Sequence, residues 1–79
     1  MNPFKRGDWV IPTGRLLREH LENKPYYVKS VNNVFVRIAD DGYHHLLLKR
    51  VKLVPNTSIF KKLYPEAKEE KNYLIIFSK

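Results

Sequence analysis

The chain has 79 residues, no cysteine, and 15 Lys and Arg against 8 Asp and Glu, which gives a formal net charge of +7. A chain of this length buries only about 60% of its unfolded surface, so there is little room for a catalytic cleft of ordinary size. Disulfides and thiolate metal sites are excluded, and no apolar run approaches the roughly 20 residues of a membrane span. We therefore expect one cytoplasmic domain, residues 1–79, that is not an enzyme, needs no cofactor and attracts polyanions.

The segment FKRGDWVIP, residues 4–12, predicts a turn followed by a short strand. Gly7 favours the turn, and Pro12 ends the strand because proline has no amide donor for the ladder. Since successive residues of a strand face opposite sides, we expect either Trp9 or Val10 to lie in the core.

A long loop is expected to follow this strand, from residue 13 to residue 24. It begins with Thr13 and Gly14, and Leu17 and Leu21 stand at i and i+4, which predicts one or two helical turns. Isolated helices of this length are marginal, so packing has to hold these turns in place.

Four further strands are predicted between residues 25 and 54, in the segments PYYVKSV, VFVRIA, YHHLLL and KRVKLV. The first two are separated by Asn32–Asn33, residue types that suit the positive φ angles of a primed hairpin turn. Asp40–Gly42 predicts the next turn. Five short strands within about 50 residues favour a small, strongly bent barrel over residues 4–55.

The remaining residues, 56–79, are expected to add a helix and one more strand to the barrel. NTSIFKKLY predicts an amphipathic helix, with Asn56 or Thr57 as N-cap and Pro65 ending it. EAKEEKN then reads as a charged helical turn. YLIIFSK predicts a last strand that is buried on both faces or covers an edge of the barrel.

The segment from Phe4 to Val54 resembles the small SH3-like barrel proteins common in bacteriophage genomes, which are distantly similar to KOW and Tudor domains. A GD-x-V opening and a closing pattern carry the resemblance, the latter being an acidic-Gly turn followed by a strand of the form R-hydrophobic-x-hydrophobic-V. It implies a mainly β, five-stranded SH3-like barrel. KOW domains have a Gly-x-x-Gly-like segment after the first strand, which this chain lacks, so their RNA contacts are not implied. The matching residues are Gly7, Asp8, Val10, Asp41, Gly42, Arg50, Val51, Leu53 and Val54.

The positive charge is unevenly distributed along the chain. From Tyr64 to Lys79 three bases balance three acids, so the whole excess of seven lies in the first 63 residues. Any anion-binding face is therefore expected on the barrel.

Basic and aromatic residues alternate on two neighbouring strands. If Val28, Val34, Val36 and Ile38 face the core, the residues between them share an outer face with two rings and two cations. Small barrels bind single-stranded nucleic acid in this way, with rings stacked on bases and cations near phosphates. The candidate binding residues are Lys5, Arg6, Arg15, Arg18, Tyr27, Lys29, Phe35, Arg37, His45, Lys49, Arg50 and Lys52.

Other chemistry is disfavoured by the residues present. Ser30, Ser58 and Ser78 lie in no nucleophile motif, and Asp40–Asp41 suits a tight turn better than a pair of catalytic carboxylates. His44 and His45 are expected to face opposite sides of a strand, so they cannot bind one metal ion together. One of them should face outward, where it could stack on a base.

Two functional hypotheses remain open at this point. The first is a non-enzymatic, phage-type binding protein that acts on nucleic acid, or on a host complex that handles it, through the basic barrel face. The second is a protein–protein module that inhibits or modulates a host enzyme, with aromatics and arginines as anchors. Self-association through an apolar edge strand is also open, and its residues are Tyr73, Leu74, Ile75, Ile76 and Phe77.

Overall fold

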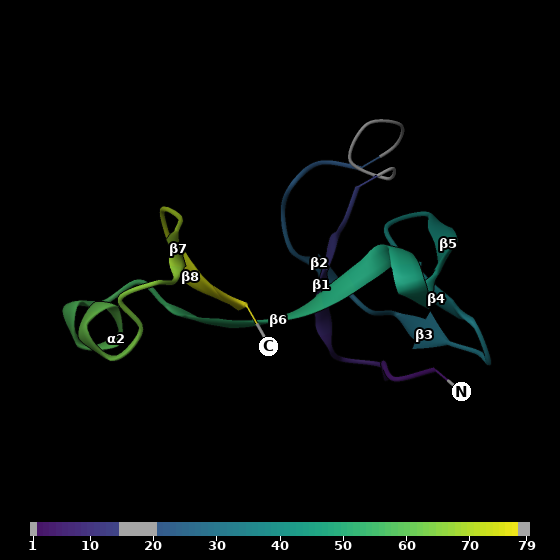
Figure 1. Ribbon diagram of the computed structural model, residues 1–79, viewed down its shortest axis with the longest axis horizontal. Helices are drawn as coiled ribbons and strands as arrows, with labels where there is room; N and C mark the ends of the chain where they lie inside the picture. The colour runs from purple at the N-terminus through teal and green to yellow at the C-terminus, as the bar shows by residue number, and fades with distance from the viewer. Residues whose placement is uncertain (1, 15–20, 78–79) are drawn as a thin grey trace.

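The computed structural model describes residues 2–14 and 21–77, and in these residues it is mainly β, with two antiparallel sheets and one short α-helix (Figure 1). The mainly β class predicted from the sequence is confirmed. Hydrogen bonding among the described strands does not close them into one barrel. The helical turns predicted in the first loop fall largely on residues 15–20, outside the described part of the chain.

The larger sheet has five strands in the order β2-β1-β6-β8-β7, and the smaller has three in the order β3-β4-β5. A 3₁₀ turn, η1, joins β5 to β6, and helix α2 follows β6. The bounds are β1 (Trp9–Pro12), β2 (Tyr26–Tyr27), β3 (Ser30–Val31), β4 (Phe35–Ile38), β5 (Asp41–His44), η1 (His45–Leu47), β6 (Leu48–Pro55), α2 (Ser58–Leu63), β7 (Lys68–Glu69) and β8 (Tyr73–Phe77).

Strand β6 connects the two ends of the molecule. Its first half, from Leu48 to Val51, pairs with β1, and its second half, from Val51 to Pro55, pairs with β8. Figure 1 shows β6 running from the three-stranded sheet to the region of α2. Val51 pairs with both neighbours, opposite Trp9 on one side and Phe77 on the other. The C-terminal hairpin thus pairs with the same strand, β6, that pairs with β1 in the N-terminal part.

Buried apolar residues form two cores on opposite faces of the five-stranded sheet. The first core contains residues from both sheets, and the second lies where β1, β6 and β8 are adjacent. Neighbouring residues of β1 contribute to different cores because successive side chains of a strand point to opposite faces. The first core is Phe4, Val10, Val28, Val36, Ile38 and Leu48; the second is Ile11, Val51 and Ile75, with Leu53 and Tyr73 packed against it.

The predicted barrel core is confirmed at three of four positions. Val28, Val36 and Ile38 are fully buried, but Val34 is 38% exposed. Val34 precedes β4 and belongs to the turn, so the alternation of the strand does not reach it. Of the two candidates in the first strand, Val10 is fully buried and Trp9 is 38% exposed.

The first hairpin turn differs from the prediction. Among the described non-glycine residues only Ala39 has a positive φ, so Asn32 and Asn33 do not form a primed turn. Instead the side-chain oxygen of Asn32 accepts hydrogen bonds from the backbone N–H of Val34 at 3.1 Å and of Phe35 at 2.9 Å. Asn32 therefore stabilises the turn through hydrogen bonds of its side chain, and its backbone does not adopt a left-handed conformation.

The second turn lies one residue earlier than predicted. Ile38 pairs with Asp41, so Ala39 and Asp40 form the turn and Gly42 lies inside β5, opposite Arg37. Ala39 takes the left-handed φ of 50° that the two-residue connection requires.

Strand YHHLLL ends earlier than predicted. β5 stops at His44, and His45–Leu47 form η1. The Nδ1 atom of His44 accepts a hydrogen bond from the N–H of Leu46 at 3.2 Å, which caps this turn.

In the C-terminal part the helix and the last strand are confirmed. Thr57 is the N-cap of α2, and its hydroxyl oxygen accepts a hydrogen bond from the N–H of Phe60 at 3.3 Å. The charged helical turn predicted for EAKEEKN is wrong, because Lys68–Glu69 form β7 and pair with Leu74 and Ile75 of β8. This pairing covers part of an apolar strand edge that would otherwise be exposed.

We predict that Ala39→Gly stabilises the fold. A left-handed conformation costs an L-residue about 1–2 kcal/mol, and the greater unfolded-state entropy of glycine offsets part of that gain. The free energy of unfolding should therefore rise by about 0.5–1 kcal/mol in urea unfolding followed by Trp9 fluorescence. Ala67→Gly is the matched control, since Ala67 has no positive φ and should lose stability. Equal destabilisation by both variants would contradict the strain assigned to Ala39.

Candidate nucleic-acid interface

Three exposed rings lie in line across the five-stranded sheet. Tyr27 of β2 pairs with Trp9 of β1, Trp9 pairs with Val51 of β6, and Val51 pairs with Phe77 of β8. Directly paired residues project from the same face of a sheet. The exposed fractions are 47% for Tyr27, 38% for Trp9 and 41% for Phe77. We call Tyr27, Trp9, Val51 and Phe77 the aromatic row.

The aromatic row shares its face of the sheet with the second core. Val51 belongs to both, and Ile11 and Ile75 lie two residues along β1 and β8 from Trp9 and Phe77; all three core residues are at most 4% exposed. Trp9 and Tyr27 meet edge to face, with ring centroids 5.5 Å apart. This contact restrains the two rings, and their exposed sides are available to a flat ligand.

Cations flank both ends of the aromatic row. Lys49 lies on the same face of β6 as Val51, and its Nζ is 5.6 Å from the centre of the Phe77 ring. At the other end the backbone of Gly7 lies beside the Tyr27 hydroxyl, 3.8 Å from where a Cβ would be. Lys5 and Arg6, both exposed, immediately precede Gly7. Of the predicted cations, Lys49 thus lies beside one end of the row, and Lys5 and Arg6 directly precede the glycine at its other end.

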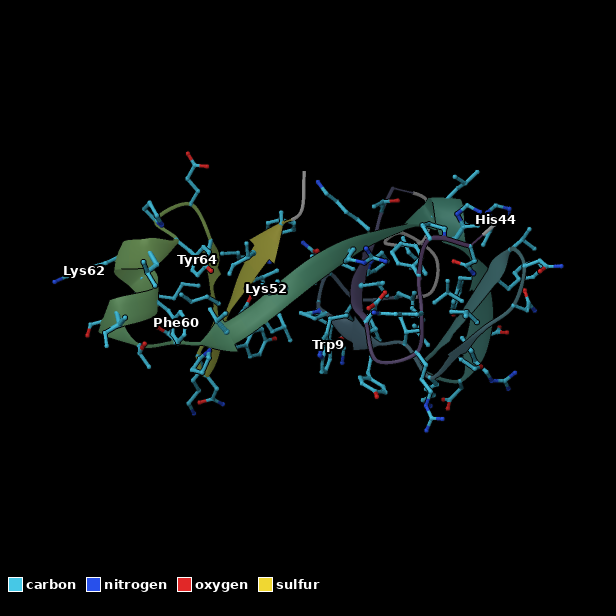
Figure 2. All side chains as sticks on the ribbon, turned by 90° about the horizontal axis from the view of Figure 1, so that it is seen from below. Trp9, His44, Lys52, Phe60, Lys62 and Tyr64 are labelled. Carbon is cyan, nitrogen blue, oxygen red and sulfur yellow. The ribbon has the colours of Figure 1, made fainter. Side chains whose placement is uncertain are left out.

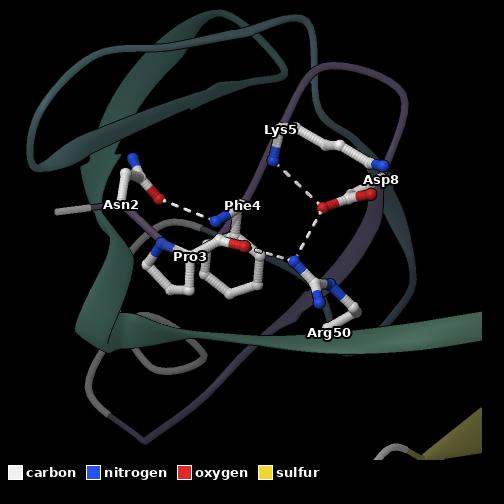
Figure 3. A network of polar contacts seen from close by, with 6 residues as sticks. All are labelled: Asn2, Pro3, Phe4, Lys5, Asp8 and Arg50. Carbon is white, nitrogen blue, oxygen red and sulfur yellow. Dashed lines mark hydrogen bonds and ion pairs between the residues drawn. The ribbon is translucent and has the colours of Figure 1, made fainter.

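Arg50, also predicted to bind a partner, contacts other residues of the same chain (Figure 3). Its Nη2 donates to the carboxylate of Asp8 at 3.0 Å and to the backbone oxygen of Pro3, and its guanidinium lies 5.3 Å from the ring of Phe4. The same carboxylate oxygen of Asp8 accepts from the N–H of Lys5 at 3.0 Å. Arg50 therefore holds the N-terminal segment against β6.

The Gly-Asp pair of the opening motif belongs to the same arrangement. Gly7 has a φ of 95°, a conformation that L-residues rarely adopt, and its N–H donates to the backbone oxygen of Val28 at 3.0 Å. The N–H of Val28 in turn donates to the backbone oxygen of Asp8 at 2.9 Å. The motif thus has a structural role in the described residues.

The face predicted from Tyr27, Lys29, Phe35 and Arg37 is divided between the two sheets. Tyr27 belongs to the aromatic row, whereas Phe35 and Arg37 lie on β4. All four are exposed, but the Lys29 ammonium donates to the backbone oxygen of Ala39. Long-range strand pairing, which places β2 beside β1 and β4 beside β5, causes this division.

The outer face of the three-stranded sheet forms a second surface, here named the β4–β5 patch: Phe35, Arg37, Gly42 and His44. Phe35 is 47% exposed and meets the His44 ring edge to face at 6.0 Å. Gly42 has no side chain to fill the space beside Phe35 and Arg37, where a shallow hollow of about 170 Å³ opens. The patch has one aromatic residue where the aromatic row has three.

His44 and His45 were predicted to face opposite sides of a strand, and this prediction is wrong. His45 begins η1, and the two imidazoles stack with centroids 4.7 Å apart. Desolvation, and then the proximity of His44, lower the pKa of His45 below its ordinary value of 6.5. Within the described residues no three His, Asp or Glu side chains gather as a metal site.

Lys52 lies apart from the aromatic row, on the opposite face of β6, with its Nζ 5.9 Å from the ring of Tyr64. Figure 2 shows Lys52 and Tyr64 at the α2 end of the molecule, His44 at the other end, and Trp9 between them. Arg15 and Arg18 lie outside the described residues.

Two rings of the aromatic row, Trp9 and Phe77, are absent from the binding residues predicted from the sequence. A signal for Trp9 was available, because the GD-x-V pattern directs Val10 inward and the residue before it must then point outward. Phe77 had no comparable signal, since its place beside Val51 depends on the pairing of β8 with β6.

Acidification is expected to destabilise the fold partly through His45. Because the pKa of His45 is lowered in the folded state, the folded protein binds this proton more weakly than the unfolded chain does. The free energy of unfolding therefore has its full value above pH 6.5 and falls as the pH drops toward the pKa of His45 in the folded state. In urea unfolding between about pH 7.5 and pH 5.5, His45→Gln should reduce the pH dependence.

Glu69→Gln is the control for this experiment. Glu69 forms a hydrogen bond and an ion pair with Lys61, and both lower the pKa of Glu69 below 4.5. The contribution of Glu69 to the free energy of unfolding is therefore lost only at a more acid pH. The native pH dependence should persist in Glu69→Gln. An unchanged dependence in His45→Gln would refute the role assigned to His45.

No helix in the described residues has the length and apolar character of a membrane span. Comparison of the chain with protein-family models, with curated proteins and with solved structures finds no match. The resemblance to phage barrel proteins accordingly stays an expectation, and a function has to be inferred from the side chains described above.

Proposed function

We propose that the protein is a non-enzymatic binding protein that holds single-stranded nucleic acid on the aromatic row. The observation that carries this proposal is the alignment of Tyr27, Trp9 and Phe77 on one face of one sheet, with Lys49 beside Phe77 and the Lys5–Arg6 turn beside Tyr27. Exposed rings stack on bases in any sequence, and neighbouring cations contact the phosphates.

A single strand fits this surface better than a duplex. The bases of a duplex are already stacked, and major-groove readout needs a helix or a two-stranded ribbon that enters the groove. The rings of the row instead lie on an open sheet face. Between β2 and β8 the row spans about 14 Å at ordinary strand spacing. We therefore expect a site at the low end of the range of about 4 to 16 nucleotides seen for small barrels.

We further propose that residues 4–55 form an SH3-like barrel of the phage type, with residues 56–79 as an extension. Two features support this. Strands of both sheets pack on the first core, and the short turn η1 leads from β5 into β6, the strand that carries the closing pattern. In this arrangement the extension adds β8 to the second half of β6, which completes the aromatic row with Phe77.

The net charge of +7 supports an anionic ligand. Binding that neutralises phosphates releases counterions, so affinity should fall steeply as salt rises. The row itself supplies the second part of the affinity through stacking, which is much less sensitive to salt. Salt dependence and ring substitutions therefore test separate parts of the proposal.

The stacking contribution can be measured with Trp9, the only tryptophan of the chain, as a fluorescent reporter. Titration with oligo-dT at low salt should quench its emission. Tyr27→Ala and Phe77→Ala should each weaken binding by about 1–3 kcal/mol, which is a factor of about 5 to 150.

Phe35→Ala is the matched control, because Phe35 and Tyr27 are equally exposed at 47% but lie on different sheets. It should leave the affinity unchanged. A loss confined to Phe35→Ala would move the site to the β4–β5 patch, and no binding of oligo-dT or oligo-U at low salt would reject the proposal.

The cationic contribution can be measured from the dependence of affinity on salt. Lys49→Met should reduce the slope of log affinity against log salt by about 0.7, the contribution of one phosphate contact with a single strand. Lys71→Met removes the same charge from the exposed turn between β7 and β8 and should leave the slope nearly unchanged. Equal effects of the two variants would show that only net charge matters and would contradict a localised contact at Lys49.

A further inference from the structure

A groove of about 560 Å³ lies between β8 and the segment that joins α2 to β7. Its apolar lining comes from Leu63, Tyr64, Pro65, Ile76 and Phe77, and Lys49 stands at its rim. Leu63 is 63% exposed and Phe77 is 41% exposed. Large apolar side chains that remain exposed around a concave surface mark a place where a partner is bound.

Strand pairing explains why the groove exists. Lys68 of β7 pairs with Ile75 of β8, so a continued ladder would place Ala67 opposite Ile76. The chain turns away instead, and the N–H of Ala67 donates to the backbone oxygen of Tyr64 at 3.1 Å. Beside Ile76 and Phe77, β8 therefore has no strand partner on this side among the described residues. An extended segment can pair there and place one side chain in the groove.

The charges around the groove indicate the chemistry of that segment. Lys49 lines the groove and lies over Phe77, and Lys52 lies over Tyr64; neither forms an ion pair with another described residue. Glu66 is the one acidic residue in the lining. An acidic segment complements this rim, whereas a second copy of a chain with a charge of +7 would be repelled.

Nucleic acid is a poorer occupant of the groove than a protein. Leu63, Pro65 and Ile76 have no aromatic face on which a base could stack. The ring of Tyr64 already stacks with Phe60 at 6.4 Å and lies under Lys52. An apolar pocket with cations at its rim instead suits an aliphatic or aromatic anchor with acidic neighbours.

We propose that this groove binds an extended, acidic segment of a partner protein, which places a large apolar side chain against Leu63 and Phe77. The anchor fills the groove, carboxylates of the segment meet Lys49 and Lys52, and the backbone pairs with β8 beside Ile76. The groove shares Lys49 and Phe77 with the proposed nucleic-acid site, but Leu63 lies outside the aromatic row, so a Leu63 variant tests the groove separately.

The test uses the full chain and a library of random twelve-residue peptides. Selection should enrich acidic peptides that contain one or two large apolar residues. A fluorescein-labelled peptide from this selection should bind Leu63→Gln at least tenfold more weakly than the native chain. Ile59→Gln is the matched control, since Ile59 is 68% exposed on the same helix but does not line the groove. It should bind the peptide with native affinity.

Oligo-dT binding by Leu63→Gln provides a check on folding, and it should equal that of the native chain if the aromatic row is the nucleic-acid site. If oligo-dT binds neither protein, urea unfolding replaces it as the check, so failure of the nucleic-acid proposal leaves this test intact. No enriched peptide, enrichment without acidic residues, or equal peptide binding by Leu63→Gln and the native chain would overturn the inference.

Discussion

The structure depends on strand β6, which is hydrogen bonded to one neighbour along its first half and to a different neighbour, on its other edge, along its second half. β6 pairs with β1 up to Val51 and with β8 from Val51 onward. Because Val51 takes part in both ladders, β1, β2 and the C-terminal hairpin share one sheet instead of being joined by a linker. The two cores on opposite faces of this sheet follow from the same arrangement, since neighbouring residues of β1, Val10 and Ile11, enter different cores. The aromatic row crosses β6 at Val51.

A high net charge does not make every cation available to a ligand. Arg50 is bound to Asp8 and to the backbone of Pro3 and covers the ring of Phe4, so its contribution lies in fixing the N-terminal segment. Lys49, next to it on β6, faces the other side of the sheet, where it lies over the ring of Phe77 and lines the groove. Two adjacent basic residues thus have different roles because strand geometry directs them to opposite faces.

Local patterns predicted the elements better than their assembly. The alternation that buries Val28, Val36 and Ile38 and the threonine cap of α2 are decided by residues close in sequence, and both were predicted. The placement of Tyr27 beside Trp9, and of Phe35 on a different sheet, is decided by pairing between distant strands, which no local pattern encodes. For the same reason β7 was read as a helical turn: its charged residues have no strand pattern of their own, and its conformation follows from the apolar edge of β8.

Because β8 pairs with β6, the C-terminal residues also affect how the N-terminal strands are exposed to solvent. A fragment that ended at Pro55 would keep every strand of the expected barrel, yet it would uncover Ile11 and Val51 and leave the second half of β6 without a partner. An apolar strand edge of that length is a template for intermolecular pairing and aggregation. The residues after Pro55 therefore cover this strand edge, and their loss should be seen first as reduced solubility.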